Sequence, residues 1–272
     1  MPPGSLLTFG PHVCGSSAGF ESEWLVTDGL GGYATGTVAG LRTRRYHGLL
    51  ITPGRDLALA ALDPVLTLPG GATVRLAVHE WASGAIDPAG HHHLEHFELA
   101  DGVPRWRWRI GAIVLERELA MLHGRNAVGV VHRLVGAPAG ASVTLTLTAL
   151  CTWRGADGER DRTGPPLSIA PGDGGVVIED GAYRLAGPGW KPINEWYRDA
   201  YAREEAARGL NPVEDLWAAG TFTATLTAGQ VMSVSAWSGD PAPPPAPAEV
   251  VTAARRRARR LLRAAGSRDA AD

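Results

Sequence analysis

Residues 23–51 read EWLVTDGLGGYATGTVAGLRTRRYHGLLI, and this stretch decides how the chain is interpreted. It places six glycines, three arginines, two tyrosines and a histidine between two apolar runs. Glycine is used where the backbone needs a positive φ, or where another group comes close to it. Arginine, tyrosine and histidine bring many hydrogen-bond donors, in a segment too rich in glycine for a helix. The stretch therefore predicts a binding surface rather than a core element.

Alternating side chains predict strands along most of the remaining chain. Residues 143–148 and 222–227 alternate β-branched, apolar and small side chains with a period of two. Residues 105–110 read RWRWRI, which puts arginines on one face of a strand and tryptophans on the other. Short strands that recur with Gly, Pro and Asp between them indicate an all-β sandwich or barrel.

Two segments are expected to be helical. Glu195 to Arg208 contains good helix formers and ends at Gly209, a suitable C-cap. Pro247 to Ala265 follows a stiff proline-rich linker. The boundary of the β domain is therefore expected near Gly239, with residues 1–239 in that domain and residues 240–272 forming the linker and an arginine-rich helix.

The arginines of the second helix allow two interpretations. A basic run can bind nucleic acid, but it is more often a solvated helix face whose apolar side packs on a neighbour. The solvated face is the favoured interpretation, and no nucleic acid is expected as a partner.

The glycine-rich stretch also resembles a known family. Its parts EWLVTDGLGGYATGT and TRRYHGLL are similar to the signature of the N-terminal domain of bacterial and archaeal glycogen debranching enzymes, which are amylo-α-1,6-glucosidases. A second patch, NPVEDLW at residues 211–217 with RGL before it, is similar to elements near the end of the same domain. The resemblance covers nearly the whole chain. Together with the strand pattern it implies an all-β fold, a supersandwich of two antiparallel sheets with one helical excursion and a C-terminal linker helix.

The resemblance implies a non-catalytic role in glycogen catabolism. Hydrolysis of α-1,6-glucosidic branch points needs two carboxyl groups placed around the scissile bond. In the family these belong to an (α/α) barrel that follows the β domain, and this barrel is expected to lie outside residues 1–272. The expected partners are that barrel, in cis or in trans, and an α-glucan such as glycogen or limit dextrin. Two alternatives stay open: a free-standing α-glucan-binding module, and a subunit that assembles with a separately encoded barrel.

The candidate site residues come from the two patches. Six side chains are expected either to bind glucan or to contact the barrel: Tyr33, Arg42, Arg44, Arg45, Tyr46 and His47. A second set is expected to shape the backbone: Gly29, Gly31, Gly32, Gly36, Gly48, Glu214, Asp215 and Trp217. Glu214 and Asp215 are expected to fix a loop or to pair with Arg208. The competing interpretation is that the six polar side chains only pair with acids inside the domain.

Two further motifs are considered and set aside. Residues 29–34 fit G-x-G-x-x-A, but a dinucleotide-binding turn must open a helix, and residues 35–40 favour a strand. His91, His92 and His93 with His96 could suggest a metal site, but on an extended strand His96 points away from His91 and His93. An exposed histidine run at a strand edge is the favoured interpretation. No metal, no cofactor and no catalytic residue is expected.

Bulk properties favour a cytoplasmic protein. The formal net charge of −2 implies neither a nucleic-acid nor a membrane partner. No apolar run is long enough to span a bilayer, and the N-terminus does not read as a secretory signal. Cys14 and Cys151 lie far apart without metal-type spacing, so both are expected to be free thiols.

Overall fold

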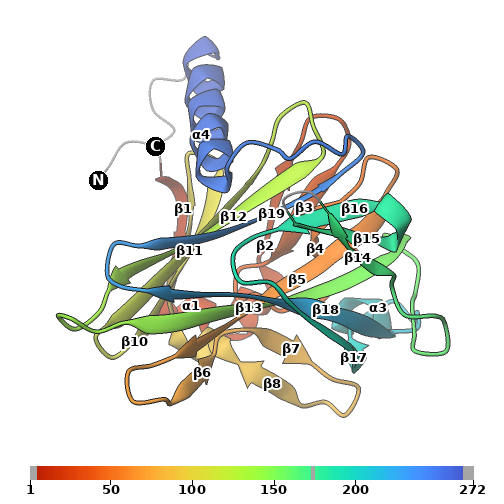
Figure 1. Cartoon of the computed structure of the whole chain (residues 1–272), viewed down its shortest axis with the longest axis horizontal. Helices are drawn as coiled ribbons and strands as arrows, with labels where there is room; N and C mark the ends of the chain where they lie inside the picture. The colour runs from red at the N-terminus through yellow and green to blue at the C-terminus, as the bar shows by residue number, and fades with distance from the viewer. Residues whose placement is uncertain (1–4, 173–174, 266–272) are drawn as a thin grey trace.

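The computed structural model describes residues 5–172 and 175–265, and most of their regular structure is antiparallel β-sheet (Figure 1). The larger sheet has nine strands, which in spatial order are β1 (Ser5–Phe9), β9 (Leu94–Ala100), β10 (Val103–Ile110), β11 (Ile113–Met121), β12 (Ala127–Gly136), β19 (Val231–Ser238), β16 (Tyr183–Ala186), β15 (Gly175–Ile178) and β14 (Ile169–Gly172).

The second sheet has eight strands. In spatial order these are β17 (Lys191–Tyr201), β18 (Val213–Leu226), β13 (Val143–Gly155), β5 (Asp56–Thr67), β4 (Gly48–Ile51), β3 (Tyr33–Thr37) and β2 (Glu23–Thr27), while β6 (Thr73–Arg75) pairs with β5. A small hairpin joins β7 (Val78–Glu80) to β8 (Ile86–Ala89). The short helices are α1 (Pro11–Cys14), α2 (Ser17–Glu21), α3 (Arg203–Ala207) and the 3-10 turns η1 (Gly90–His93) and η2 (Glu179–Gly181).

The two large sheets form a sandwich around one main apolar core, which confirms the predicted fold class. The RWRWRI strand shows how the period-two pattern produces it. Trp106 and Trp108 point into the core and are almost fully buried, while Arg107 on the other face pairs with Glu95 and Glu116 at 2.8 and 2.7 Å. The outer face of this sheet is thus charged, and its inner face is apolar.

The helix expected over Glu195 to Arg208 is wrong for most of its length. Lys191–Tyr201 is the strand β17, and only Arg203–Ala207 is helical. Trp196 packs edge-on against Trp217 of β18, with ring centroids 5.0 Å apart, so sheet packing overrides local helix propensity. The register with β18 shifts twice along β17, near Asn194 and Asp199, which both adopt a φ of 62°.

The C-terminal helix is confirmed as α4 (Pro247–Ala264). It lies against the outer face of the nine-stranded sheet, where Val250 and Val251 pack with Val103, Ala120 and Val131 (Figure 1). Two of its arginines pair with strand residues. Arg255 contacts Glu118, and Arg259 donates from Nε to Asp101 at 2.9 Å. Part of the basic run therefore fixes the helix to the β domain. No helix in the described residues is both long and apolar enough for a membrane span.

Two basic side chains lie inside the sandwich. Arg117 of β11 is stacked over the ring of Trp106 at 4.0 Å, and burial lowers its pKa to about 10. His132 lies opposite it on β12, fully buried, and neither ring nitrogen has a hydrogen-bond partner among the described residues. Burial and the neighbouring Arg117 lower the pKa of His132 from 6.5 to about 3, so this histidine is neutral in the folded protein.

We expect acid to destabilise the domain through its buried histidines. Burial lowers the pKa of His47 and His132 to about 3 and that of His91 to about 4, whereas in the unfolded chain each takes up a proton near pH 6.5. Between pH 6.5 and 4 the unfolded state therefore binds more protons, and the free energy of unfolding falls as the pH falls. Each histidine contributes about 1.4 kcal/mol per pH unit across most of this window.

Replacement of His132 by Leu should make this pH dependence shallower by about 1.4 kcal/mol per pH unit between pH 4 and 6. Urea unfolding at a series of pH values measures the slope. A vertical shift of the whole curve, with its slope unchanged, would contradict the prediction.

Candidate functional site

The turn between β2 and β3 is built around the buried carboxylate of Asp28. Its Oδ1 accepts hydrogen bonds from the backbone N–H groups of Leu30 and Gly32, at 2.7 and 3.0 Å, and its Oδ2 accepts one from Asn126 Nδ2 at 2.8 Å. Asn126 also accepts a hydrogen bond from the Ser238 hydroxyl at 2.5 Å. A chain of three side chains therefore joins this turn to the opposite sheet.

Three glycines of this turn have no room or no suitable conformation for another residue. Gly29 and Gly31 adopt φ values of 80° and 104°. A Cβ atom on Gly32 would lie 2.1 Å from Asn126 Nδ2 and 2.2 Å from Asp28 Oδ2. Gly32 is therefore what lets the backbone approach the Asp28 carboxylate.

The other two glycines of the motif differ from each other. A Cβ on Gly48 would lie 2.2 Å from a methyl carbon of the fully buried Leu57 and 3.1 Å from the carbonyl oxygen of Leu59, so a larger residue would require Leu57 of the neighbouring strand β5 to shift. A Cβ on Gly36 would make an ordinary contact of 3.4 Å with the Trp24 ring. Gly36 is thus not required by space.

The loop at residues 38–47 is held by the buried carboxylate of Glu214. Arg154 of β13 binds this carboxylate through two nitrogens, with Nε at 2.8 Å and an Nη at 2.7 Å, and Arg42 donates to the same group at 2.8 Å. Two arginines around one carboxylate leave a net positive charge in a site that is largely closed to water. The expected pairing of Glu214 with Arg208 is not made, because Arg208 contacts Glu205 instead.

Arg45 points into the domain rather than away from it. Its side chain donates to the carbonyl oxygens of Asp157 and Asn211 and contacts the carboxylate of Glu159 at 3.1 Å. Its backbone N–H donates to the buried carboxylate of Glu205 at 3.1 Å. Arg45 thus ties the loop to segments more than 100 residues away.

His47 is completely buried and neutral. Burial, with Arg42 and Arg44 nearby, lowers its pKa to about 3. Its Nδ1 accepts the backbone N–H of Thr43 at 3.2 Å, so the ring proton sits on Nε2, which lies 3.4 Å from Glu23 Oε1. The same Glu23 oxygen accepts a hydrogen bond from Arg44 Nε at 2.6 Å.

The second patch also has a structural role. Asp215 accepts the backbone N–H of Arg162 at 2.9 Å and that of Asp199 at 2.8 Å, so it fixes the loop after β13 to β17. Trp217 is buried beneath Trp196.

A surface groove lies above this framework on the outer side of β2 and β3, with a volume of about 710 Å³. Tyr33 and Tyr46 contribute half-buried rings to it. The remaining lining residues are polar or small for the most part: Glu23, Trp24, Leu25, Thr27, Gly29, Gly31, Gly32, Thr35 and Arg55. We call this the tyrosine groove. Its aromatic rings, hydroxyl groups and single carboxylate suit a polyhydroxylated ligand.

The predicted polar residues therefore separate into two sets. Tyr33 and Tyr46 line the tyrosine groove. Arg44 lies at its margin, with its Cζ 5.9 Å from the centroid of the Tyr46 ring. Arg42, Arg45 and His47 lie below and make contacts within the domain. Sequence reasoning missed Arg154, because its pairing with Glu214 joins two strands 60 residues apart and leaves no local pattern.

The histidine run is arranged differently from the expectation. His91 to His93 form the 3-10 turn η1, not an extended strand, and His91 is buried against Phe20 with ring centroids 5.0 Å apart. The expectation that the run is exposed is thus wrong for His91. Within residues 5–172 and 175–265, no group of three or more His, Cys, Asp or Glu side chains is placed to hold a metal ion.

Comparison with known protein families gives one match. Residues 22–233 match the family described as glycogen debranching enzyme N terminal, which is most of the chain. The protein belongs to this family of glycogen debranching enzyme N-terminal domains. No curated protein matches the sequence significantly.

One similar solved structure is that of a bacterial glucoamylase complexed with acarbose. It is 8% identical in sequence, with a TM-score of 0.33, and the match covers 89% of this chain. The match spans 36% of the glucoamylase chain.

We expect Gly32→Ala to unfold the β2–β3 turn. The new methyl group would collide with the Asp28 carboxylate and the Asn126 amide, and separating them breaks a buried hydrogen bond, so the loss of stability should exceed about 2 kcal/mol. Gly36→Ala is the matched control, because its methyl group meets only the Trp24 ring at contact distance. Urea unfolding of both variants measures the difference. Equal losses would show that the clash is relieved elsewhere.

Glu214→Gln should destabilise the domain by about 3–5 kcal/mol, since it leaves Arg42 and Arg154 buried without a counter-charge. The control is Glu204→Gln, a partly exposed carboxylate 3.8 Å from Arg44, which should cost less than about 1 kcal/mol. Thermal and urea unfolding test both. A mild effect at Glu214 would mean that water reaches the two arginines.

Proposed function

We propose that this chain acts as the non-catalytic N-terminal domain of a glycogen debranching enzyme that hydrolyses α-1,6-glucosidic branch points in glycogen catabolism. In this proposal the tyrosine groove helps to shape or support the α-glucan site of a catalytic (α/α) barrel that lies outside these residues. Residues 1–239 form the domain, and residues 240–272 lead towards the barrel, in the same polypeptide or in a separately encoded one.

The proposal rests on the positions of the signature's side chains in the structure. Its buried members make contacts within the domain, while the half-buried Tyr33 and Tyr46 and the exposed Glu23 line one groove. Aromatic rings pack well on the C–H faces of pyranoses, and threonine hydroxyls and the Arg55 guanidinium can bind sugar hydroxyl groups. This division supports a glucan-facing surface on an otherwise structural domain.

The positions of the acidic side chains support a non-catalytic role. Glycosidases place two carboxyl groups about 5–9.5 Å apart across the scissile bond. Glu23 is the one carboxylate among the residues that line the tyrosine groove, and Arg44 already holds it. The buried carboxylates of Glu205, Glu214 and Asp215 are engaged in the framework.

We also propose a cytoplasmic location. Cys14 and Cys151 are both free and buried, and burial raises the pKa of each thiol. Free thiols suit a reducing compartment such as the cytoplasm, in which disulfides are rare.

Glycogen binding by the isolated chain is the first test. Tyr33→Ala and Tyr46→Ala should each lower the affinity for glycogen about three- to tenfold, the size of one aromatic contact, without unfolding the domain. Tyr201→Ala is the matched control, because Tyr201 is half-buried at the end of β17, outside the groove. Affinity electrophoresis in glycogen gels, with circular dichroism of each variant, provides both readouts.

The same preparation should be incubated with limit dextrin and assayed for glucose. Binding without glucose release supports a recognition domain. Glucose release above the buffer control contradicts the non-catalytic role. Wild-type binding by both tyrosine variants removes the groove from the proposal and leaves a domain that only supports the barrel.

A further inference from the structure

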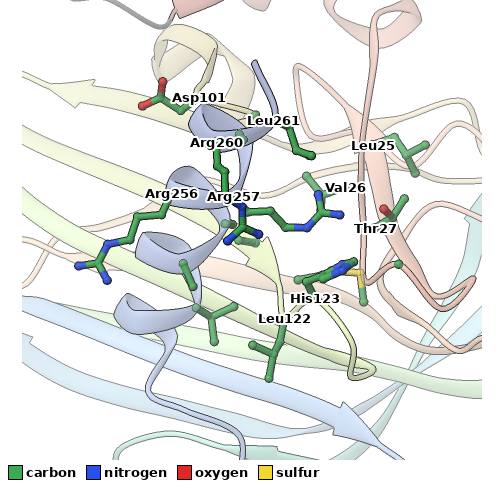
Figure 2. Close-up of a pocket in the computed structure, with 18 residues that line it drawn as sticks. Leu25, Val26, Thr27, Asp101, Leu122, His123, Arg256, Arg257, Arg260 and Leu261 are labelled. Carbon is green, nitrogen blue, oxygen red and sulfur yellow. The ribbon is translucent and has the colours of Figure 1, made fainter. Parts of the chain in front are cut away.

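A second groove runs between helix α4 and strand β2, with a volume of about 620 Å³ (Figure 2). One wall is formed by residues 25–27 of β2 and the other by residues 253–261 of α4, while the floor is formed by the end of β11 and the next two residues, Leu122 and His123. Of the eight-stranded sheet, only β2 and the turn after it contribute to the lining, through Gly29. The groove therefore opens on the side of β2 that faces away from β3.

That side of β2 is a free strand edge. In the described residues β2 pairs with β3 alone and stands last in its sheet. The hydrogen bonds from Val38 N to Ser22 O and from Asp28 N to Gly32 O show that the even-numbered residues face β3. The backbone N–H and C=O groups of Glu23, Leu25 and Thr27 consequently point into the open side. Such an edge is a template for another strand.

The helix wall carries positive charge without local partners. Arg255 and Arg259 pair with Glu118 and Asp101. By contrast, Arg257 and Arg260 line the groove and have no carboxylate within 4 Å in the described parts of the chain. In Figure 2, the Arg257 side chain extends from the helix towards Val26 and His123. The one acidic lining residue, Asp101, is already neutralised by Arg259.

Apolar groups complete the groove. Leu25 and Leu261 face solvent with 59% and 49% of their surface exposed, and both line the groove together with Met121 and Leu122. Proteins usually protect such an edge strand, with an exposed leucine at its centre, from pairing with other chains. Free backbone groups, unpaired arginines and exposed leucines thus meet at one place.

We propose that this groove receives an extended, acidic segment of the catalytic domain, which pairs with the free edge of β2 and places carboxylates against Arg257 and Arg260. The inference rests on the proposed function for the identity of the partner. The backbone of the segment continues the eight-stranded sheet by one strand. Its apolar side chains cover Leu25 and Leu261, and its charge complements that of α4. The interface is therefore an extension of the sheet and not a contact between two finished surfaces.

The test uses the 272-residue chain and a labelled acidic strand peptide, acetyl-Glu-Val-Glu-Val-Glu-Val-Thr-amide, in fluorescence anisotropy. Two peptides serve as controls: the same sequence with Lys for Glu, and the acidic sequence with its central Val replaced by Pro. The acidic peptide should bind, and both controls should bind at least tenfold more weakly, a difference of about 1.4 kcal/mol. A labelled oligothymidylate is measured alongside them.

Variants of the chain test separately how charge and backbone pairing contribute to peptide binding. Arg257→Glu should weaken the acidic peptide at least tenfold, whereas Arg263→Glu, the same charge change on the same helix outside the groove, should stay within twofold. Leu25→Pro removes an N–H group from the free edge only, and should abolish binding, while Leu25→Ala keeps the edge and should weaken binding less.

Hydrogen exchange gives a readout that does not depend on affinity differences between variants. Bound peptide should slow exchange at the amides of Leu25 and Thr27, and leave those of Trp24 and Val26 unchanged, since these already face β3.

Several results would overturn the inference: no binding of the acidic peptide, equal binding by Arg257→Glu, tighter binding of the Lys peptide or the oligonucleotide, or a dimer of the chain that Leu25→Pro dissociates, which would assign the edge to a second copy. None of these depends on glycogen. If the peptide experiment fails, the proposed function is therefore still tested separately by glycogen binding.

Discussion

The buried carboxylate of Glu214 holds together three segments that are far apart in the sequence. It joins β18 to Arg154 of β13 and to Arg42 of the loop between β3 and β4. The Arg154 guanidinium also donates to the Arg45 carbonyl oxygen at 2.9 Å, so one ionic cluster sets the course of the whole loop. Two cations and one anion are tolerable in a closed site only because backbone carbonyl groups accept the remaining N–H groups. The groove above can therefore be open and polar while its base stays fixed.

Asp28 has the corresponding role at the other end of the signature. It accepts hydrogen bonds from two backbone N–H groups of its own turn and from Asn126, which in turn binds Ser238 of β19, so the turn is fixed to both sheets. Gly29 and Gly31 are needed for their positive φ values, and Gly32 because the backbone there passes too close to Asp28 and Asn126 for a Cβ atom. The backbone of the signature is thus held by two buried carboxylates: Asp28 within it, and Glu214 about 180 residues later. Its exposed side chains are free to serve another purpose.

Much of the fold could be predicted from the sequence, because period-two alternation directly reports which side chains face the core. RWRWRI is the clearest case, and α4 follows from its apolar stripe and the prolines before it. A helix over residues 195–201 is the wrong prediction because good helix formers there are outweighed by the packing of Trp196 on Trp217, a contact that no window of sequence contains. The sequence predicts which segment forms the site, but not which of its side chains turn inward and which line the groove. Nothing local distinguishes Arg42 and Arg45, which turn inward, from Arg44, which stays near the surface, because their partners lie more than 100 residues away.

The two ion pairs of α4 have a consequence for whatever follows the helix. Arg255 and Arg259 are four residues apart, so they lie on the same side of the helix, and both are paired with strand residues. They fix the rotation of α4 about its own axis as well as its position. An α-helix turns by about 100° per residue. In the enzyme that we propose, the orientation of the barrel about the helix axis would therefore depend on the number of helical residues after Arg259, and lengthening α4 by one residue after that point would rotate the barrel by roughly a quarter turn.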